Sequence, residues 1–322
     1  MSQEVMSRPT ETLERKVPVS GEPHDEHDND EETKMMYAML VDSMSFVAAA
    51  LRAAESERSD AIIHDPFARE LASDFGIKAQ LLSATEWSPT SLSSSHHADL
   101  LALRTRYLDE ALEHRDQSIQ QIVLLAAGLD ARAFRLPTLK DCLVVEIDRS
   151  QDQFDHKRNV MQSANARKMA KSHHFIVTDL VEHDWEQKLL NETEFDKSKP
   201  TFWCLEGAVG YLDYVSIADL MKTIDGLSPS GSKFWVDMAG EIMVRAEFIL
   251  GHTLRFGEDD PMNGVLGVTK WDLETQADLS KPGNHFGRQW KPITIGENQD
   301  PVPYSFIIGT KPSNDEKAPG QL

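Results

Sequence analysis

A glycine turn between two apolar segments is the feature of this chain best suited to chemistry. Residues 122–125 form a short aliphatic run just before Gly128, and a second run, 143–147, ends at Asp148. Such runs are typical of parallel strands covered on both faces. Glycine lets the backbone approach a ligand closely, and an acid at the tip of the next strand can accept hydrogen bonds from both ribose hydroxyls of an adenosine. The spacing therefore predicts a site for an adenosine-containing cofactor.

The composition of the turn bears on which cofactor binds. Residues 126–130, AAGLD, hold one glycine, whereas a pyrophosphate needs close backbone approach over several residues and a loop with more glycines. S-adenosyl-L-methionine carries no phosphate, so the turn favours a methyl donor over a nicotinamide. Segment 131–136 is expected to start a helix whose N–H groups face the ligand. The other alternative is a turn that binds no ligand, but Asp130 and Asp148 would then have no evident function.

Acidic residues follow two further apolar segments. Asp179 comes after 174–177, and Glu206 comes after 201–205. The carboxyl ends of parallel strands meet at one edge of a sheet, so these acids are expected to converge with Asp148 on one crevice. Asp179 could equally cap the helix that follows.

Four ordered segments carry a resemblance to a known family. HDPFAREL, AAGLDARAFRL, VVEIDRSQ and CLEGAVGYL resemble the leucine carboxyl methyltransferase family, and more closely its small-molecule O-methyltransferase-like branch. The matches cover about residues 44–214. The resemblance implies an α/β, Rossmann-like class I methyltransferase fold, with a mostly parallel seven-stranded sheet, helices on both faces and an N-terminal helical cap. It also implies S-adenosyl-L-methionine as cofactor.

The resemblance assigns roles to individual residues. Arg104 would pair with the methionine carboxylate of the donor, and Glu206 would bind its ammonium group. Asp179 and Leu180 would bind the adenine, and Tyr211 would lie near the transferred methyl group.

Each of these roles has a plainer alternative. Arg104 could form a helix-surface ion pair with Asp109 or Glu110, and Tyr211 could be a packing residue. Arg52 could reach the donor carboxylate, yet a cation near a helix C-terminus is favourable with no other role.

The chain divides by composition into tails and one methyltransferase domain. The first 33 residues hold ten acidic and three basic side chains, which predicts a disordered acidic tail. His24 and His27 in this tail could hold a metal ion weakly, but a solvated charge run is favoured. The expected parts are the tail 1–33, a helical cap 34–117, a core 118–312 with a divergent insertion at about 240–298, and a flexible tail 313–322.

Helical spacing and apolar runs predict further elements. Asp65 is expected to cap a helix over 66–72. The remaining expectations are a helix from Lys34 to about residue 51, a loop-rich stretch at 73–95, a helix over 96–114, and strands at 234–238 and 304–309.

Charge and cysteine content exclude several classes of protein. The formal net charge of −20 would repel a phosphate backbone, so nucleic acid is not an expected partner. Cys142 and Cys204 show no metal-ligand spacing and are expected to be buried thiols in a reducing cytoplasm. Residues 1–20 contain no apolar core, so a signal peptide is not expected, and no apolar run approaches the roughly 18 residues that a membrane span needs.

The predicted reaction follows from the donor. A sulfonium methyl group is already activated, so the protein chiefly has to align an acceptor oxygen with it. A carboxylate is ionised at neutral pH and needs no base, whereas a hydroxyl would need one. His173, His252 and His285 are candidates for that base, although a surface or core position is favoured for each. The sequence thus predicts O-methylation of a carboxylate or hydroxyl of a small molecule, such as one of secondary metabolism. The alternatives are an NAD(P)-dependent oxidoreductase and a non-catalytic protein that binds the donor.

Overall fold

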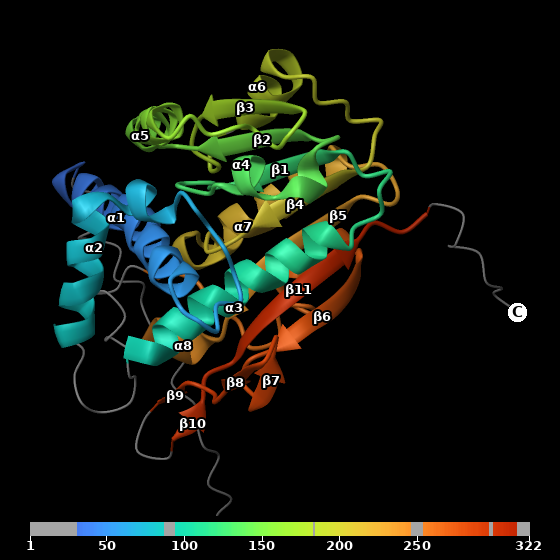
Figure 1. Ribbon diagram of the computed structural model, residues 1–322. Helices are drawn as coiled ribbons and strands as arrows, with labels where there is room; N and C mark the ends of the chain where they lie inside the picture. Colours follow the sequence, from blue (N-terminus) through green and yellow to red (C-terminus); the bar gives the residue numbers. More distant parts are fainter. Residues whose placement is uncertain (1–30, 87–93, 183, 246–253, 296–298, 314–322) are drawn as a thin grey trace, which may run out of the picture.

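A seven-stranded sheet forms the centre of the molecule (Figure 1). The computed structural model describes residues 31–86, 94–182, 184–245, 254–295 and 299–313. The predicted tails, with His24 and His27, lie almost wholly outside these residues. The sheet order is β3-β2-β1-β4-β5-β11-β6. Its strands are β1 Gln121–Leu125, β2 Leu143–Asp148, β3 Ser172–Val177, β4 Thr201–Leu205, β5 Lys233–Ala239, β6 Asp272–Asp278 and β11 Tyr304–Thr310.

The first five strands are parallel, and β11 runs antiparallel to both of its neighbours. All five residues of β1 and of β4 are buried, which explains the apolar runs that follow Gln121 and Thr201. The order of connection reverses between β1 and β4, and ligands bind at such a point in open α/β sheets. The predicted fold class is confirmed.

Strand β6 was not recognised in the sequence, because it lies within the stretch expected to be a divergent insertion. Its sequence, DLETQAD, is mostly polar, and Ala277 is its one buried residue. A strand at the edge of a sheet that faces solvent carries no apolar run, so the sequence pattern could not reveal it.

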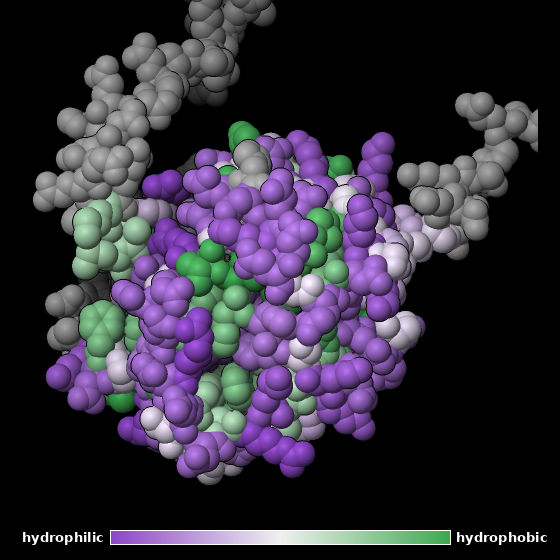
Figure 2. All heavy atoms as spheres, turned by 90° about the horizontal axis from the view of Figure 1, so that it is seen from above, coloured by the Kyte–Doolittle hydropathy of each residue, from purple (hydrophilic) through white to green (hydrophobic). Residues whose placement is uncertain are grey.

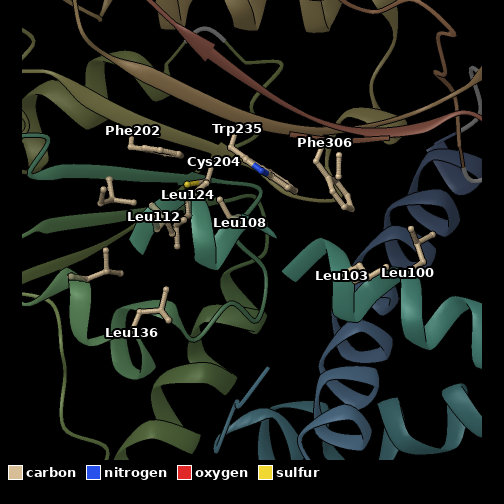
Figure 3. Packing of buried hydrophobic residues seen from close by; sticks show 14 of the residues in the cluster. Leu100, Leu103, Leu108, Leu112, Leu124, Leu136, Phe202, Cys204, Trp235 and Phe306 are labelled. Atoms are coloured by element: carbon tan, nitrogen blue, oxygen red, sulfur yellow. The ribbon is translucent and has the colours of Figure 1, made fainter. Parts of the chain in front are cut away.

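Helices cover both faces of the sheet. On one face lie α3 Ser94–Glu113, α4 Arg132–Arg135 and α5 Gln151–Ser163, and on the other lie α6 Trp185–Glu192 and α7 Tyr214–Gly226. Figure 3 shows the first of these cores, where Leu108 and Leu112 of α3 lie beside Leu124 and Cys204 of the sheet. Alternate residues of each strand thus enter opposite cores.

Helices α1 Glu31–Ser56 and α2 Ala68–Glu86 lie against each other beside the carboxyl ends of the strands (Figure 1). A Cβ on Gly76 would collide with the carbonyl group of Phe46, so glycine permits the close helix contact. The expected loop at 73–95 is therefore partly wrong, since α2 continues to Glu86. Ser73, at φ 53°, interrupts α2 after the predicted segment 66–72.

One helix meets the length and composition of a membrane span, which corrects the expectation that no segment does so. Residues 37–56 of α1 are long and apolar enough by that measure. In the structure this helix packs on α2, and its buried ionic side chains form pairs within the domain, Arg52 with Asp65 and Glu55 with Arg288.

The remaining elements lie around the end of the chain. They are α8 Glu241–Arg245, the short 3₁₀ turns η1 Pro137–Leu139, η2 Val209–Tyr211 and η3 Val265–Thr269, and the strand pairs β7 Gly283–His285 with β8 Arg288–Trp290 and β9 Thr294–Ile295 with β10 Asp300–Pro301. The surface seen from above is mostly hydrophilic, as the charge of −20 leads one to expect (Figure 2).

A fully buried ion pair joins α5 to the sheet. Lys157 pairs with Glu146 of β2, and both side chains are inaccessible to solvent. His173 Nε2 lies 2.8 Å from the other carboxylate oxygen of Glu146. This arrangement places His173, one of the candidate bases, in the core and not in a cavity.

Replacing Lys157 tests this buried pair. Lys157→Met should lower the free energy of unfolding by about 3–5 kcal/mol, because it leaves the Glu146 carboxylate buried without its cation. Arg158→Met on the same helix is the control and should cost less than about 0.5 kcal/mol, since Arg158 pairs with Asp155 at the surface. Urea denaturation at pH 7 measures both. Equal losses for the two variants would contradict the assignment.

Candidate cofactor site

A cavity of about 540 Å³ opens at the carboxyl ends of β1, β2, β3 and β4. Helix α1 contributes one wall and α3 another, and most of the other lining residues come from the turns after the four strands. This volume is in the range of small-molecule sites. All eight residues proposed from the sequence to bind the cofactor line it, and so does Tyr211: Arg52, Arg104, Gly128, Asp130, Asp148, Asp179, Leu180 and Glu206.

The turn after β1 is fixed by the acid that ends β2. Gly128 has φ 46°, and its N–H donates to Asp148 Oδ2 over 2.8 Å. The N–H of Ser150 donates to Asp148 Oδ1 over 2.9 Å. A Cβ on Gly128 would lie 3.0 Å from Cβ of Ser45 in α1, so the turn needs a glycine both for its torsion angle and for its contact with the cap.

Asp148 is buried, and this burial raises the pKa of its carboxyl group despite the two N–H donors. Next to the turn, Gln153 Oε1 is buried and accepts no hydrogen bond from any described residue. Oxygen acceptors at the end of β2 are therefore available to a ligand that carries hydroxyl groups.

The helix after the turn differs from the expectation. Segment 131–136 was predicted to direct free N–H groups at the ligand, but α4 has only four residues and Asp130 Oδ1 accepts the N–H of Arg132 over 2.6 Å. Asp130 also pairs with the Arg132 guanidinium. Burial opposes ionisation of Asp130, but the positive charge of Arg132 outweighs it and lowers the pKa. Asp130 thus orders the turn through Arg132.

Glu206 lies between two arginines at the end of β4. Its Oε2 is 2.6 Å from Arg132 Nη1, and its Oε1 is 3.3 Å from Arg104 Nε. The hydroxyl of Thr105 donates to Oε1 over 3.1 Å. Burial alone would raise the pKa of Glu206, but Arg132 and then Arg104 lower it to about 2. The alternative of a surface pair between Arg104 and Asp109 or Glu110 is wrong, since Arg104 pairs with Glu206. Asp109 instead pairs with Arg132 and Arg135.

Sequence reasoning missed a support for Arg104. Asp237 in β5 lies 3.7 Å from the Arg104 guanidinium, and it accepts the N–H of Gly207 over 2.6 Å and the hydroxyl of Tyr304 over 2.5 Å. Gly207 has φ 65°, and a Cβ there would lie 2.8 Å from Arg104 Nη1. The sequence feature that could have revealed this support is Asp237 itself, an acid within an apolar strand, because a buried carboxylate needs partners.

The turn after β3 supplies the neighbouring wall. Asp179 Oδ1 accepts the N–H of Val181 over 3.1 Å, so this carboxylate does not cap α6. Asp184 is at the N-cap position, but its side chain accepts from Thr178 and pairs with Lys188 instead of capping. Asp179 and Leu180 stay beside the cavity.

Arg52 ties the cap to the turn. Its Nη2 donates to the carbonyl of Leu129 over 2.8 Å, and its Nε lies 3.3 Å from Asp65. Arg52 therefore has a structural task, although it lines the cavity. Asp65, predicted to cap a helix, also accepts the N–H of Phe67 over 3.1 Å.

Tyr211 lines the cavity near Arg104, and the carbonyl of the preceding residue, Gly210, accepts the N–H of Arg255. Burial raises the pKa of its phenol to about 12, so the phenol keeps its proton at neutral pH. Its carbonyl accepts the hydroxyl of Tyr37 of α1 over 3.2 Å.

Of the histidines proposed as bases, neither His173 nor His285 lines the cavity. His285 lies 2.6 Å from the hydroxyl of Tyr107, away from the cavity, and His252 lies outside the described residues. Both cysteines are free and buried, and burial raises the pKa of each thiol. Within the described ranges, no group of three His, Cys, Asp or Glu side chains could hold a metal ion.

Comparison with known proteins identifies a family whose model matches this chain. The family model for leucine carboxyl methyltransferase matches residues 45–225. A Streptomyces coelicolor protein, provisionally named as an S-adenosyl-L-methionine-dependent methyltransferase, is 38% identical over 195 residues, which cover 58% of this chain and 62% of that protein. A Mycobacterium ulcerans protein with the same provisional name is 39% identical over 194 residues, 57% and 60% of the two chains. The matched part thus spans about three fifths of these relatives.

The crystal structure of a provisionally named methyltransferase from Thermobifida fusca has the same fold. It superposes with a TM-score of 0.55 and covers 84% of this chain and 95% of its own. At 13% identity this likeness concerns the fold alone.

Glu206 should make stability depend on pH. Its pKa falls from an ordinary 4.5 to about 2 on folding, so its contribution is complete above about pH 4.5 and is lost as the pH falls toward 2. Glu206→Gln should lower the free energy of unfolding by about 3 kcal/mol at pH 7. The difference in the free energy of unfolding between wild type and the variant should narrow as the pH falls below about 4.5.

Urea denaturation between pH 7 and pH 4 measures this difference. Glu113→Gln is the control, because Glu113 pairs with Arg106 at the surface and should contribute less than about 0.5 kcal/mol. A Glu206→Gln difference that stays constant down to pH 4 would show that the carboxylate is not held ionised by the arginines.

Proposed function

The chain belongs to the leucine carboxyl methyltransferase family, and from this membership we propose that it transfers the methyl group of S-adenosyl-L-methionine to an oxygen atom of a small molecule. The observation that carries the proposal is the placement of Arg104 and Glu206 in the same cavity as Asp148. Arg104 and Glu206 place opposite charges at the carboxyl end of β4, and Asp148 places a hydrogen-bond acceptor at the carboxyl end of β2.

The residues present fit the donor. Its methionine portion carries a carboxylate and an ammonium group, which require a cation and an anion side by side, and Arg104 and Glu206 supply them. Its ribose carries two hydroxyls, which require acceptors, and Asp148 with the unsatisfied Gln153 Oε1 supplies these at the end of β2. Asp179 and Leu180 would then lie along the adenine.

The same contacts disfavour a nicotinamide cofactor. A pyrophosphate needs free backbone N–H groups at the turn after β1. The N–H of Gly128 is taken by Asp148, and the N–H of Arg132 is taken by Asp130. Two carboxylates thus occupy the donors that a pyrophosphate would need, and they would repel it.

A carboxylate is the acceptor group that the cavity favours. The bound donor would supply an activated methyl group, so the chain has to position the acceptor and exclude water. No histidine or lysine is among the described residues that line the cavity, and Tyr211 holds its proton. A carboxylate is ionised at neutral pH without help, whereas an alcohol would need a base.

The buried free thiols fit a reducing, cytoplasmic setting.

Calorimetry with S-adenosylhomocysteine tests the donor site. Wild type should bind one equivalent, Arg104→Ala should weaken binding about 30-fold or more through loss of a charge-assisted contact, and Asp148→Asn should weaken it about tenfold. Arg106→Ala is the matched control, because Arg106 is on the same helix, does not line the cavity and pairs with Glu113. Its affinity should equal that of wild type.

Transfer of a labelled methyl group from S-adenosyl-L-methionine to a panel of small carboxylic acids tests the reaction. A base-labile methyl ester is expected, whereas a product stable to base would indicate a hydroxyl acceptor. Failure of the wild-type protein to bind S-adenosylhomocysteine would contradict the proposed function. Binding without transfer to any acid or alcohol would favour the alternative of a non-catalytic binding protein.

A further inference from the structure

We propose that Arg255 is the residue that selects acceptors carrying an oxyanion, a carboxylate or a phosphate. The inference rests on the proposed function, because it assigns the acceptor side of the same cavity. Arg255 lies in the stretch at 240–298 that matches the family poorly in sequence, and it lines the cavity near Tyr37 and Tyr211.

Ion pairing distinguishes Arg255 from the other arginines of the cavity. The other four each have a carboxylate within 4.0 Å: Arg52 pairs with Asp65, Arg104 with Glu206, Arg132 with Asp130 and Arg149 with Asp42. Arg255 has none within that distance among the residues that the structure describes. In a chain of net charge −20, a cation left without an acid beside a cavity is unexpected unless a ligand supplies the anion.

Asp213 is the acid whose charge interacts with Arg255. Its carboxylate is already used at the start of α7, where Asp213 Oδ1 accepts the N–H of Ser216 over 2.7 Å. Asp213 therefore attracts Arg255 at longer range, and no described residue accepts a hydrogen bond from the Arg255 guanidinium group.

The contact of Arg255 with Tyr37 keeps the guanidinium N–H groups available. The guanidinium carbon lies over the Tyr37 ring, 4.0 Å from its centre, and a cation–π contact of this kind requires none of the guanidinium hydrogen bonds. The five N–H donors of a guanidinium point outward in its plane, and two of them can bind a carboxylate or phosphate together. Tyr37 thus orients Arg255 without consuming its hydrogen bonds.

The backbone on both sides of this contact is anchored to the turn after β4. The N–H groups of Arg255 and Phe256 both donate to the carbonyl of Gly210, over 2.7 and 3.2 Å. A Cβ on Gly210 would lie 2.9 Å from Leu254 Cδ2, so glycine allows this approach. Tyr37 in turn donates to the carbonyl of Tyr211. Arg255 is therefore held at a defined place beside the reacting end of the proposed donor site.

Apolar side chains of α1 and of the turn after β4 also line the cavity. Val41, Met44 and Leu212 line the cavity with the ring of Tyr37. A ligand that matches the wall and Arg255 together has an apolar body and one oxyanion. Benzoate, phenyl phosphate and the neutral benzamide are small probes that vary the anion and keep the ring.

Binding of these probes to the full chain saturated with S-adenosylhomocysteine tests the proposal. Wild type should bind benzoate or phenyl phosphate at least tenfold more tightly than benzamide, measured by ligand-observed NMR titration. Arg255→Leu should lose at least tenfold in affinity for the anion and keep its affinity for benzamide, and Arg255→Lys should lie between. Arg158→Leu, which removes the same charge from the surface of α5, should bind as wild type does.

The outcomes separate this inference from the proposed function. Arg255→Leu should bind S-adenosylhomocysteine as tightly as wild type, which shows that the donor site and the fold are intact. Wild type that shows no preference for either anion over benzamide would overturn the inference, as would an Arg255→Leu protein that keeps the preference. Preference for only one of the two anions supports it and identifies the oxyanion. Failure of all variants, wild type included, to bind S-adenosylhomocysteine would instead count against the proposed function.

Discussion

The Glu206 carboxylate between the guanidinium groups of Arg104 and Arg132 is the interaction on which the rest of the site depends. Burying an ion costs several kcal/mol unless partners of opposite charge and hydrogen-bond donors surround it. Here the cost is met by a chain of pairs. Arg132 also contacts Asp130 and Asp109, and Asp109 holds Arg135. The sheet edge and the turn after β1 are thereby fixed by one set of charges.

The same network reaches the helical cap. Arg135 lies 3.9 Å from Asp65, which pairs with Arg52 of α1, and Arg52 donates to the carbonyl of Leu129 in the turn. The small side chains of Ala49 and Ala50 bring α1 close to this turn. Closure of the cavity by α1 is thus a consequence of the pairs that order its floor. Residues that hold the fold and residues proposed to bind the donor are largely the same ones.

The two sides of the cavity are built differently. The proposed donor side comes from the ends of strands whose positions are set by the two cores. The proposed acceptor side comes from the first half of α1, the turn η2 and the segment around Arg255. Segments of the second kind can change without disturbing the sheet, which is why specificity commonly resides on them. Proteins of one fold can therefore bind the same methyl donor and differ in the acceptor that they bind.

The sequence by itself determined the strands with continuous apolar runs and the acids that follow them, because burial on both faces leaves a local pattern. It also located the glycine turn, since the torsion angle at Gly128 is a local requirement. The sequence did not reveal β6, whose polar residues lie at the sheet edge, or the extension of α2 past Ser73.

Only the tertiary structure decided the partners of the charged residues. Arg104 and Asp237, or Arg132 and Glu206, are far apart along the chain, and no local pattern pairs them. The energy of a buried charge depends on what surrounds it in space, so the residue types could be recognised from sequence while their pairing required the fold.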